Sequence, residues 1–220
     1  MMSFAPLLLS FKVALIATAL SGLFGTLLGA LLANKRLPLR DLIDVLVTAP
    51  MVLPPTVLGY YVLVALGRRS SLGTLYEGLV GSPIVFSQTG AVVAATIGSL
   101  PLVVKSARAA LEAVDPAFIS AARTLGATPL RAFLTVQLPL AGGGILAGLM
   151  LGFARALGDF GVTLMVAGDI PGETQTASLA IYDAIQANRH DEALGMVAVL
   201  TALAIALLYA INKLAARRPQ

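Results

Sequence analysis

The stretch from Val13 to Asn34, VALIATALSGLFGTLLGALLAN, contains no charged residue and no histidine. A helix of about 20 such residues crosses the hydrocarbon core of a bilayer. Further long runs free of Asp, Glu, Lys, Arg and His are Val45–Gly67, Gly78–Val104, Ala132–Ala154 and Ala193–Asn212. The sequence therefore predicts an all-α polytopic membrane protein in one domain, with five transmembrane helices near residues 13–34, 45–67, 84–105, 138–157 and 193–213.

The composition supports this assignment. Of the 220 residues, 58% are hydrophobic and 12% are charged, and the mean hydropathy is +0.90. Soluble domains are usually about 25% charged, so lipid has to cover much of the apolar surface. Cysteine is absent and His190 is the one histidine, which excludes a disulfide framework and a cysteine- or histidine-rich metal site. The net charge of +4 is spread over short loops and does not indicate nucleic-acid binding.

The loop charges predict the orientation. Basic residues are concentrated in one set of loops, at Lys35, Arg36, Arg40, Lys105, Arg108, Arg123, Arg131, Lys213, Arg217 and Arg218. The opposite set holds most of the acidic residues and fewer basic ones, namely Lys12, Arg68, Arg69, Arg155 and Arg189. By the positive-inside rule the first set is cytoplasmic, so the N-terminus lies outside and the C-terminus inside. The first run is expected to be a retained helix, because its stronger positive cluster follows it rather than preceding it.

Prolines and glycines mark individual runs. Pro50, Pro54 and Pro55 have to bend or break the second run, either as a packing kink or as a bent helix that lines a path. Glycines repeat at helical spacing in the first and fourth runs, at Gly25, Gly29, Gly144, Gly148 and Gly152. Such stripes let helices approach closely, and packing within the chain is favoured over a dimer face.

The segment between the third and fourth runs carries two helix-start signals. Asp115-Pro116 and Thr128-Pro129 each place a capping residue before a proline at the first helical position, and Gly126 falls where a helix should stop. We expect short helices near Pro116–Leu125 and Pro129–Gln137. The first presents a slim surface of small residues, which suits a helix that lies in a cleft on a partner.

Sequence signatures of catalysis are missing. Ser99 and Val104 replace the glycines that a phosphate loop needs before Lys105-Ser106, and no carboxylate pair lies within a predicted span. The chain is therefore expected not to be an enzyme. A passive channel, a partner-driven transporter and an assembly factor remain open at this point.

The segment Ala121-Ala122-x-x-x-Gly126, nine residues, then Val136-x-Leu138-Pro139 resembles the EAA loop of ABC importer permeases. That family has Glu-Ala-Ala, three residues, Gly, nine residues and Ile-x-Leu-Pro; Ser120 stands here in place of Glu and Val136 in place of Ile. The resemblance implies a cytoplasmic coupling loop over residues 115–139, whose ATPase-coupling residues are Ser120, Ala121, Ala122, Gly126, Leu138 and Pro139.

A second stretch, Gly158 to Thr176, is similar to the molybdate branch of these permeases. It reads GDFGVTLMVAGDIPGETQT, with Asp159 and Asp169 where that branch has Glu and Asn. Sulfate permeases share the first part of the pattern but diverge after the proline. The resemblance implies an extracellular signature loop marked by Gly158, Asp159, Gly161, Gly168, Pro171, Thr174 and Gln175. An apolar stretch within it, Val162–Ala167, is either a segment that dips into the membrane or a loop with a buried strand or turn.

The family resemblance also implies the assembly and the cargo. We expect an inner-membrane permease subunit that pairs with a second copy of itself, with two cytoplasmic ATPase subunits that bind ATP and Mg, and with an extracytoplasmic oxyanion-binding protein. No buried positive cluster is evident in the spans, so a path of weak polar contacts is expected, lined or gated by Pro54, Pro55, Thr163 and Met165. Sulfate, thiosulfate or tungstate are the alternative cargoes, and a stand-alone channel or a membrane scaffold is the alternative function.

Overall fold

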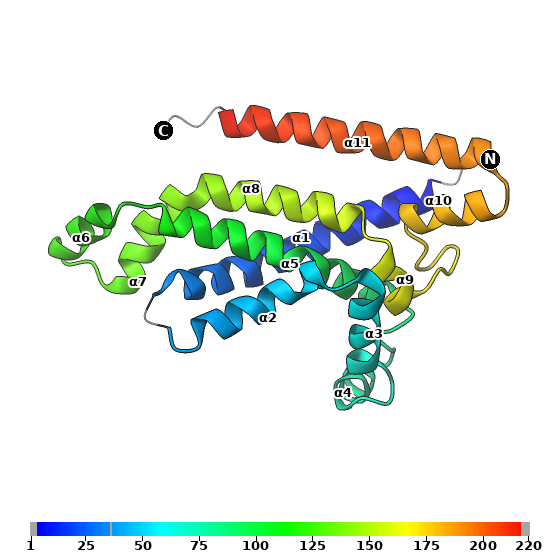
Figure 1. Ribbon diagram of the computed structural model, residues 1–220, viewed down its shortest axis with the longest axis horizontal. Coiled ribbons are helices and arrows are strands. Elements are labelled where there is room, and N and C mark those ends of the chain that lie inside the picture. The colour runs from blue at the N-terminus through cyan, green and yellow to red at the C-terminus, as the bar shows by residue number, and fades with distance from the viewer. Residues whose placement is uncertain (1–3, 36, 217–220) are drawn as a thin grey trace.

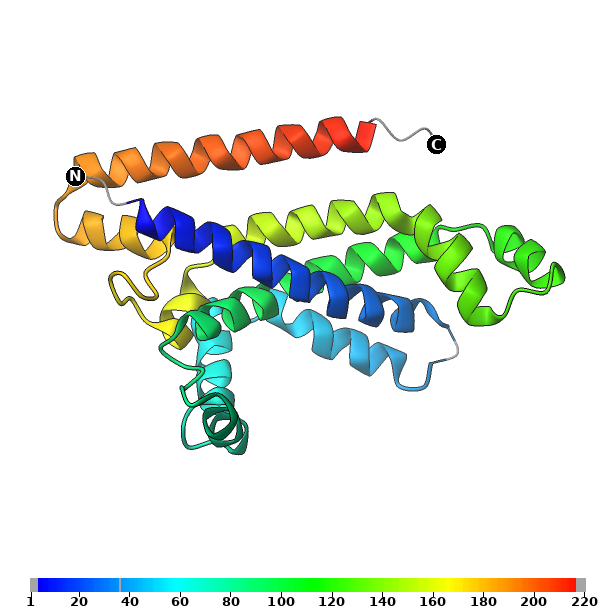
Figure 2. The ribbon, with the colours of Figure 1, turned by 180° about the vertical axis from the view of Figure 1, so that it is seen from behind.

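The computed structural model describes residues 4–35 and 37–216 (Figure 1). The regular elements within those residues are all helical: α1 (Ala5–Ala33), α2 (Arg40–Val52), α3 (Pro55–Leu66), α4 (Ser71–Val80), α5 (Gln88–Glu112), α6 (Pro116–Thr124), α7 (Pro129–Ala132), the π-helical turn η1 (Phe133–Gln137), α8 (Leu138–Leu157), α9 (Gly161–Ala167), α10 (Ala177–Gln186) and α11 (His190–Ala216). Helices α1, α2, α5, α8 and α11 run lengthwise along the molecule, whereas α3 turns away from them (Figures 1 and 2).

The core forms where α5 packs against α1 and α8, which also contact each other. A Cβ built on Gly25 would lie 2.9 Å from the Cβ of Val103, and one built on Gly148 would lie 2.4 Å from the Cβ of Ser106. Similarly close approaches to α5 are made by Gly29, Gly144 and Gly152. Both glycine stripes therefore serve packing within the chain, as predicted.

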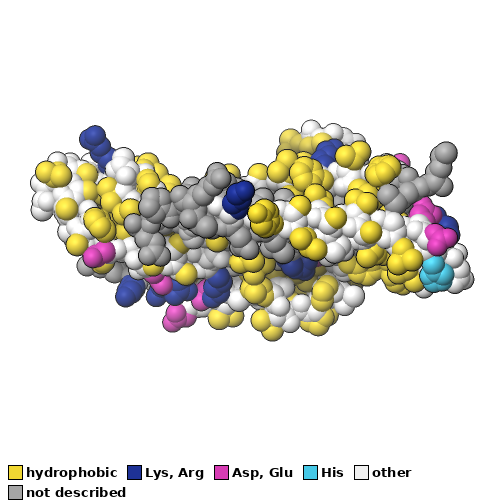
Figure 3. Space-filling model, turned by 90° about the horizontal axis from the view of Figure 1, so that it is seen from above, with side chains coloured by type: hydrophobic (Ala, Val, Ile, Leu, Met, Phe, Trp, Pro, Cys, Tyr) yellow, Lys and Arg dark blue, Asp and Glu magenta, His cyan; other side chains and the backbone are white. Residues whose placement is uncertain are grey.

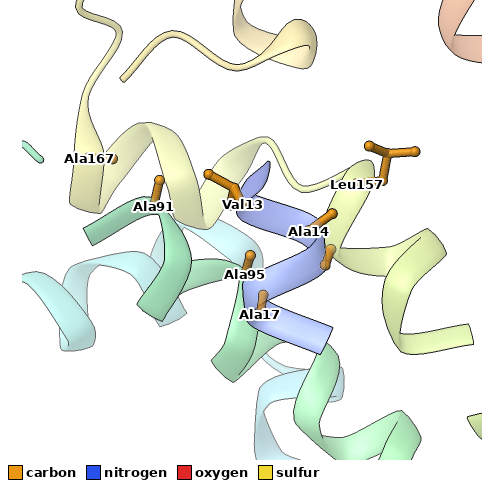
Figure 4. Close-up of a cluster of buried hydrophobic side chains, with 8 residues drawn as sticks. Val13, Ala14, Ala17, Ala91, Ala95, Leu157 and Ala167 are labelled. Carbon is orange, nitrogen blue, oxygen red and sulfur yellow. The ribbon is translucent and has the colours of Figure 1, made fainter. Parts of the chain in front are cut away.

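Alanines extend this close packing along α1. In Figure 4, Ala14 and Ala17 of α1 lie beside Ala95 of α5, and all three are almost fully buried. Methyl side chains fill little space, so the two backbones can approach closely. Large apolar side chains of α1 are instead exposed on its outer surface, at Leu8, Leu15, Leu23, Leu27 and Leu31. Figure 3 likewise shows hydrophobic side chains over much of one face, with the acidic ones toward its two ends.

Several helices could cross a membrane. Within the described residues, the segments long and apolar enough are Ala5–Ala33, Gln88–Glu112 and Pro129–Leu157, and α2 with α3 would make a fourth as one bent span. These helices support a polytopic, all-helical membrane protein. Helix α11, which carries the last apolar run, is not among those segments, so the count of five spans stays a prediction.

The second apolar run is broken into α2 and α3, which are bent by 116° relative to each other. Pro54 and Pro55 have no N–H to donate, and Leu53 takes the extended ψ of 138° that a residue before proline favours. Pro50 lies inside α2 without ending it. The prolines thus break the run as predicted. With 13 and 12 residues, neither half is long enough to cross a bilayer alone.

The predicted helix Pro129–Gln137 was wrong as a separate element. It begins as expected, with the Thr128 hydroxyl accepting a hydrogen bond from the N–H of Arg131 at 3.3 Å. The chain then stays helical through η1 into α8. In this turn the N–H of Leu138 donates to the carbonyl of Phe133, a wider π-type step that accommodates Pro139, which has no N–H.

Apart from α3 and α4, the helix ends lie mainly toward two ends of the molecule (Figures 1 and 2). The loop between α1 and α2, helices α6 and α7 and the last turns of α11 lie at one end of the molecule, and α9, α10 and the start of α11 lie at the other (Figures 1 and 2). At the first end, the Arg40 Nε donates to the carbonyl of Leu32 at 2.6 Å, and the guanidinium pairs with Glu112 of α5. Of the basic segments grouped by the sequence pattern, the parts within residues 4–35 and 37–216 therefore lie toward one end, whose side of the membrane stays a prediction.

Candidate functional site

Residues within or next to α6 determine where this helix begins and ends. The Asp115 carboxylate accepts a hydrogen bond from the N–H of Ala117 at 2.8 Å, and Pro116 occupies the first turn. Proline costs nothing there, because that N–H has no partner within a helix. The helix ends before Gly126, whose φ of +87° is a left-handed conformation that glycine adopts without a steric penalty. Both expected boundary signals of α6 are thus present.

Helix α6 stands clear of the core. It has no buried residue, and Ser120 and Ala121 are exposed while Ala122 is half-buried. Phe118 is also exposed, and Leu125 at the end of the helix is 89% exposed. Figure 1 shows α6 projecting at the end of the molecule that holds the loop between α1 and α2. An exposed helix of small residues flanked by apolar ones suits insertion into a partner.

The remaining residues of the coupling pattern lie apart from α6. Leu138 and Pro139 begin α8, beyond the π-helical turn. The neighbouring Gln137 amide donates from Nε2 to the carbonyl of Leu111 at 3.2 Å, which joins the start of α8 to the end of α5. The coupling pattern therefore combines an exposed helix, α6, with a following segment that is hydrogen-bonded to the end of α5.

At the other end, the bent helix meets α9. A Cβ built on Gly161 would lie 2.6 Å from the Cβ of Pro55, and one built on Gly59 would lie 2.6 Å from the Cβ of Met165. The apolar stretch 162–167 is thus part of a helix packed on α3 and α5, not a strand or a turn.

The carboxylate of Asp159 is hydrogen-bonded to the first turn of α9. One carboxylate oxygen, Oδ2, accepts hydrogen bonds from the N–H and the hydroxyl of Thr163 at 3.0 and 2.7 Å. The other, Oδ1, accepts one from Arg155 Nη1 at 2.9 Å. The Asp159 side chain is 2% exposed and that of Arg155 is 36% exposed. A buried carboxylate is therefore compensated by one cation and two neutral donors, as burial of a charge requires.

A cavity of about 220 Å³ opens at the bend. Helices α2, α3, α5, α8 and α9 contribute its walls, through Pro50, Met51, Leu53, Pro55, Leu58, Gly98, Leu102, Arg155 and Val162. Of the predicted path residues, Pro55 lines it, whereas Pro54 is not in its wall. Thr163 is buried and bonded to Asp159, and Met165 packs on Gly59.

Arg155 was missed as a site residue. The charge pattern grouped it with the outer loops, although the predicted span 138–157 includes it; the structure places it in the last turn of α8, beside the cavity. The available signal was its spacing of four residues from Asp159, which puts the two side chains on one face of a helix.

A second cavity, of about 440 Å³, lies further along α2. It is lined by Asp44, Val45, Thr48, Ala49, Val52, Leu53 and Lys105. Lys105 Nζ donates to both carboxylate oxygens of Asp44, at 2.8 and 2.9 Å, and Arg108 Nη1 lies 3.1 Å from Asp44 Oδ2. Leu53 belongs to the walls of both cavities.

The rest of the signature loop is held by internal hydrogen bonds. The Thr174 hydroxyl accepts from the N–H of Ile170 at 3.1 Å and donates to the carbonyl of Gly168 at 3.2 Å. Gly158 caps α8, and Pro171 follows Ile170 in the turn. Gln175 lies in a shallow pocket shared with Lys12. Within the residues that the structure describes, no group of three or more His, Asp or Glu side chains could hold a metal ion.

The chain is similar in sequence to known transport proteins. The family model described as binding-protein-dependent transport system inner membrane component matches residues 25–219. The chain is 45% identical over 179 residues to the molybdenum transport system permease protein ModB of Escherichia coli (strain K12), covering 81% of this chain and 78% of the relative. It is 33% identical over 207 residues to the sulfate transport system permease protein CysT of Salmonella typhimurium, covering 93% and 73%.

Among solved structures, the chain resembles a structure of the MetNI methionine ABC transporter in an inward-facing conformation. The TM-score is 0.79 and the sequence identity 17%, and the match covers 100% of this chain and 97% of the other. At this identity the likeness concerns the fold alone.

Proposed function

The chain belongs to the family of binding-protein-dependent transport system inner membrane components, and from that premise we propose that it is the membrane-spanning permease subunit of an ATP-driven importer of molybdate. The similarity to the E. coli molybdenum permease, at 45% identity, carries the cargo assignment. The chain itself is a transport subunit, and ATP with Mg is bound and hydrolysed on a partner.

Membership of this family supports the following assembly. Two copies of the chain pair around a central path in the inner membrane, each with five spans, an outer N-terminus and a cytoplasmic C-terminus. Two ABC ATPase subunits dock on the cytoplasmic side, and an extracytoplasmic binding protein delivers the oxyanion to the side that carries the loop 158–176.

Helix α6 is the coupling element. Its exposure and its slim Ser120–Ala122 surface support insertion into a cleft of the ATPase, and the Gln137–Leu111 hydrogen bond supports transfer of its movement to α5 and α8. Closure of the ATPase pair would draw the two α6 helices together and tilt the spans. Access to the path would then switch from one side of the membrane to the other.

A charge on the α6 surface tests the coupling. Ala121→Glu places a carboxylate on an exposed position of α6, so folding should be unaffected while association with the ATPase and molybdate uptake are lost. Ala113→Glu, also exposed but outside α6, is the matched control and should retain both. Normal ATPase binding and uptake by Ala121→Glu would overturn the docking assignment.

Sulfate is the second candidate cargo, because the chain is also 33% identical to a sulfate permease. The assay is uptake of labelled molybdate in vesicles that contain the assembled importer, with sulfate, thiosulfate or tungstate as competitor. Molybdate import that excess sulfate leaves unchanged is the expected result. Import of sulfate in preference to molybdate would reassign the cargo, and ion flux without the ATPase would identify a channel.

A further inference from the structure

The cavity at the bend and the cavity further along α2 are both lined by one stripe of α5. Gly98 and Leu102 line the first cavity and Lys105 lines the second. These residues are spaced by four and three positions, so they share one face of the helix, and that face packs against α2. Leu53, at the break between α2 and α3, belongs to both walls. The two cavities therefore adjoin at Leu53.

Each cavity contains one cation that is partly open to it. The Arg155 guanidinium has five N–H donors, and within the described residues its hydrogen bond goes to Asp159. Donors therefore remain for a ligand. A Cβ built on Gly98 would lie 3.5 Å from Arg155 Nη2, an ordinary van der Waals contact, so the guanidinium lies next to this glycine of α5. Lys105, whose side chain is 43% exposed, lines the second cavity.

Both cations can be released without leaving a carboxylate unpaired. Asp159 is also held by the N–H and hydroxyl of Thr163, and Asp44 is also held by Arg108 at 3.1 Å. If Arg155 or Lys105 turns toward a ligand, its carboxylate keeps other donors. The cost of opening either pair is therefore lower than for an isolated buried ion pair.

We propose that Arg155 and Lys105 are two successive binding stations for the transported dianion, divided by Leu53 at the bend. This inference rests on the proposed function. A dianion needs positive charge to leave water, but it must bind weakly enough to move on. The carboxylates of Asp159 and Asp44 compete with the ligand for the same cations and so weaken its binding. Gly98, which lies beside Arg155, and Lys105 are about 10 Å apart along the axis of α5.

Transport by the complete importer in lipid vesicles tests each station. Arg155→Gln and Lys105→Gln should each lower the initial rate of molybdate import roughly tenfold, as expected for loss of one charge-assisted contact. Arg155→Lys should retain part of the rate because it keeps the charge. The matched control is Arg189→Gln, which removes an arginine paired with Asp183 and Glu192 outside the cavities and should import at the normal rate.

Retention of labelled molybdate by the permease–ATPase complex, without the binding protein, separates an anion site from a structural ion pair. Lys105→Gln and Asp44→Asn break the same pair, so a purely structural role would change retention in the same direction in both. If Lys105 binds the anion, the two variants should change molybdate retention in opposite directions. Lys105→Gln should lower retention, because the cation is lost. Asp44→Asn should raise it, because Lys105 no longer pairs with a carboxylate that competes with the anion.

Different experimental results would contradict the proposed function and the two binding stations. A wild-type importer that moves no oxyanion would overturn the proposed function and this inference with it. Normal wild-type import together with normal import by Arg155→Gln and Lys105→Gln would overturn the two stations alone, and so would retention changes of the same sign in Lys105→Gln and Asp44→Asn.

Discussion

Gly161, the first residue of α9, lies so close to Pro55, the first residue of α3, that a Cβ on Gly161 would stand 2.6 Å from the Cβ of Pro55. Real Cβ atoms essentially never approach so closely. The proline ring is part of the backbone and cannot rotate away, so any side chain at 161 has to push α3 and α9 apart. This contact sets the position of the bent helix relative to the residues around Asp159.

Gly161→Ala should therefore destabilise the protein. Overpacking of this kind costs about 1–3 kcal/mol, measurable as a lower free energy of unfolding in detergent. Gly78→Ala is the control, because nothing lies within 4 Å of a Cβ at that exposed position of α4; alanine there should be neutral or slightly stabilising. An equal loss in both variants would contradict the close contact as the cause.

Asp115→Ala should weaken the binding of the ATPase. Helix α6 has no buried residue, so its cap is a large part of what keeps it helical, and loss of a cap costs about 1 kcal/mol. A several-fold higher Kd for the ATPase is expected, while the unfolding of the rest of the protein stays unchanged. Asp115→Asn can still accept the hydrogen bond from Ala117 and should bind normally. Weak binding by both variants would point to the charge instead of the cap.

Gly126→Ala should strain the turn after α6 without any clash. The φ of +87° is unfavourable for a residue with a Cβ, at about 1–2 kcal/mol, although the space around it is open. Coupled ATP hydrolysis in the assembled importer should fall. Gly126→Asn should fall less, because asparagine tolerates the left-handed region. The same activity in alanine and asparagine variants would show that this turn does not need that conformation.

Ser10→Ala should destabilise the junction between α1 and α10. The Ser10 hydroxyl accepts a buried hydrogen bond from the N–H of Ala177 at 2.7 Å, and a buried donor left without a partner costs about 1–3 kcal/mol. Ser21→Ala is the matched control in the same helix. Its hydroxyl donates to the carbonyl of Thr18 at 3.3 Å, which the α-helix already uses, so its loss should be close to neutral. Equal unfolding free energies for the two variants would rule out this role of Ser10.

Local signals predicted a large part of the helical structure. Asp115-Pro116 and Thr128-Pro129 act through atoms within three residues, so their helix starts could be read without tertiary contacts. The break after Leu53 follows from two prolines that lack N–H donors. The end of the helix begun at Pro129 could not be predicted, because the π-helical turn Phe133–Gln137 depends on how the chain enters the packed helix α8.

The amino-acid sequence by itself determined that the chain is an all-helical membrane protein, where α6 begins and ends, and which glycines lie in close helix contacts, because hydrophobic runs, caps and helical spacing act over one or two turns. Only the tertiary structure decided that Thr163 donates to the buried carboxylate of Asp159, and that Arg155 and Lys105 line two cavities that share Leu53 in their walls. Those relationships involve α2, α5, α8 and α9. Their side chains are far apart in the sequence and are brought together by helix packing, which the spacing of nearby residues does not predict.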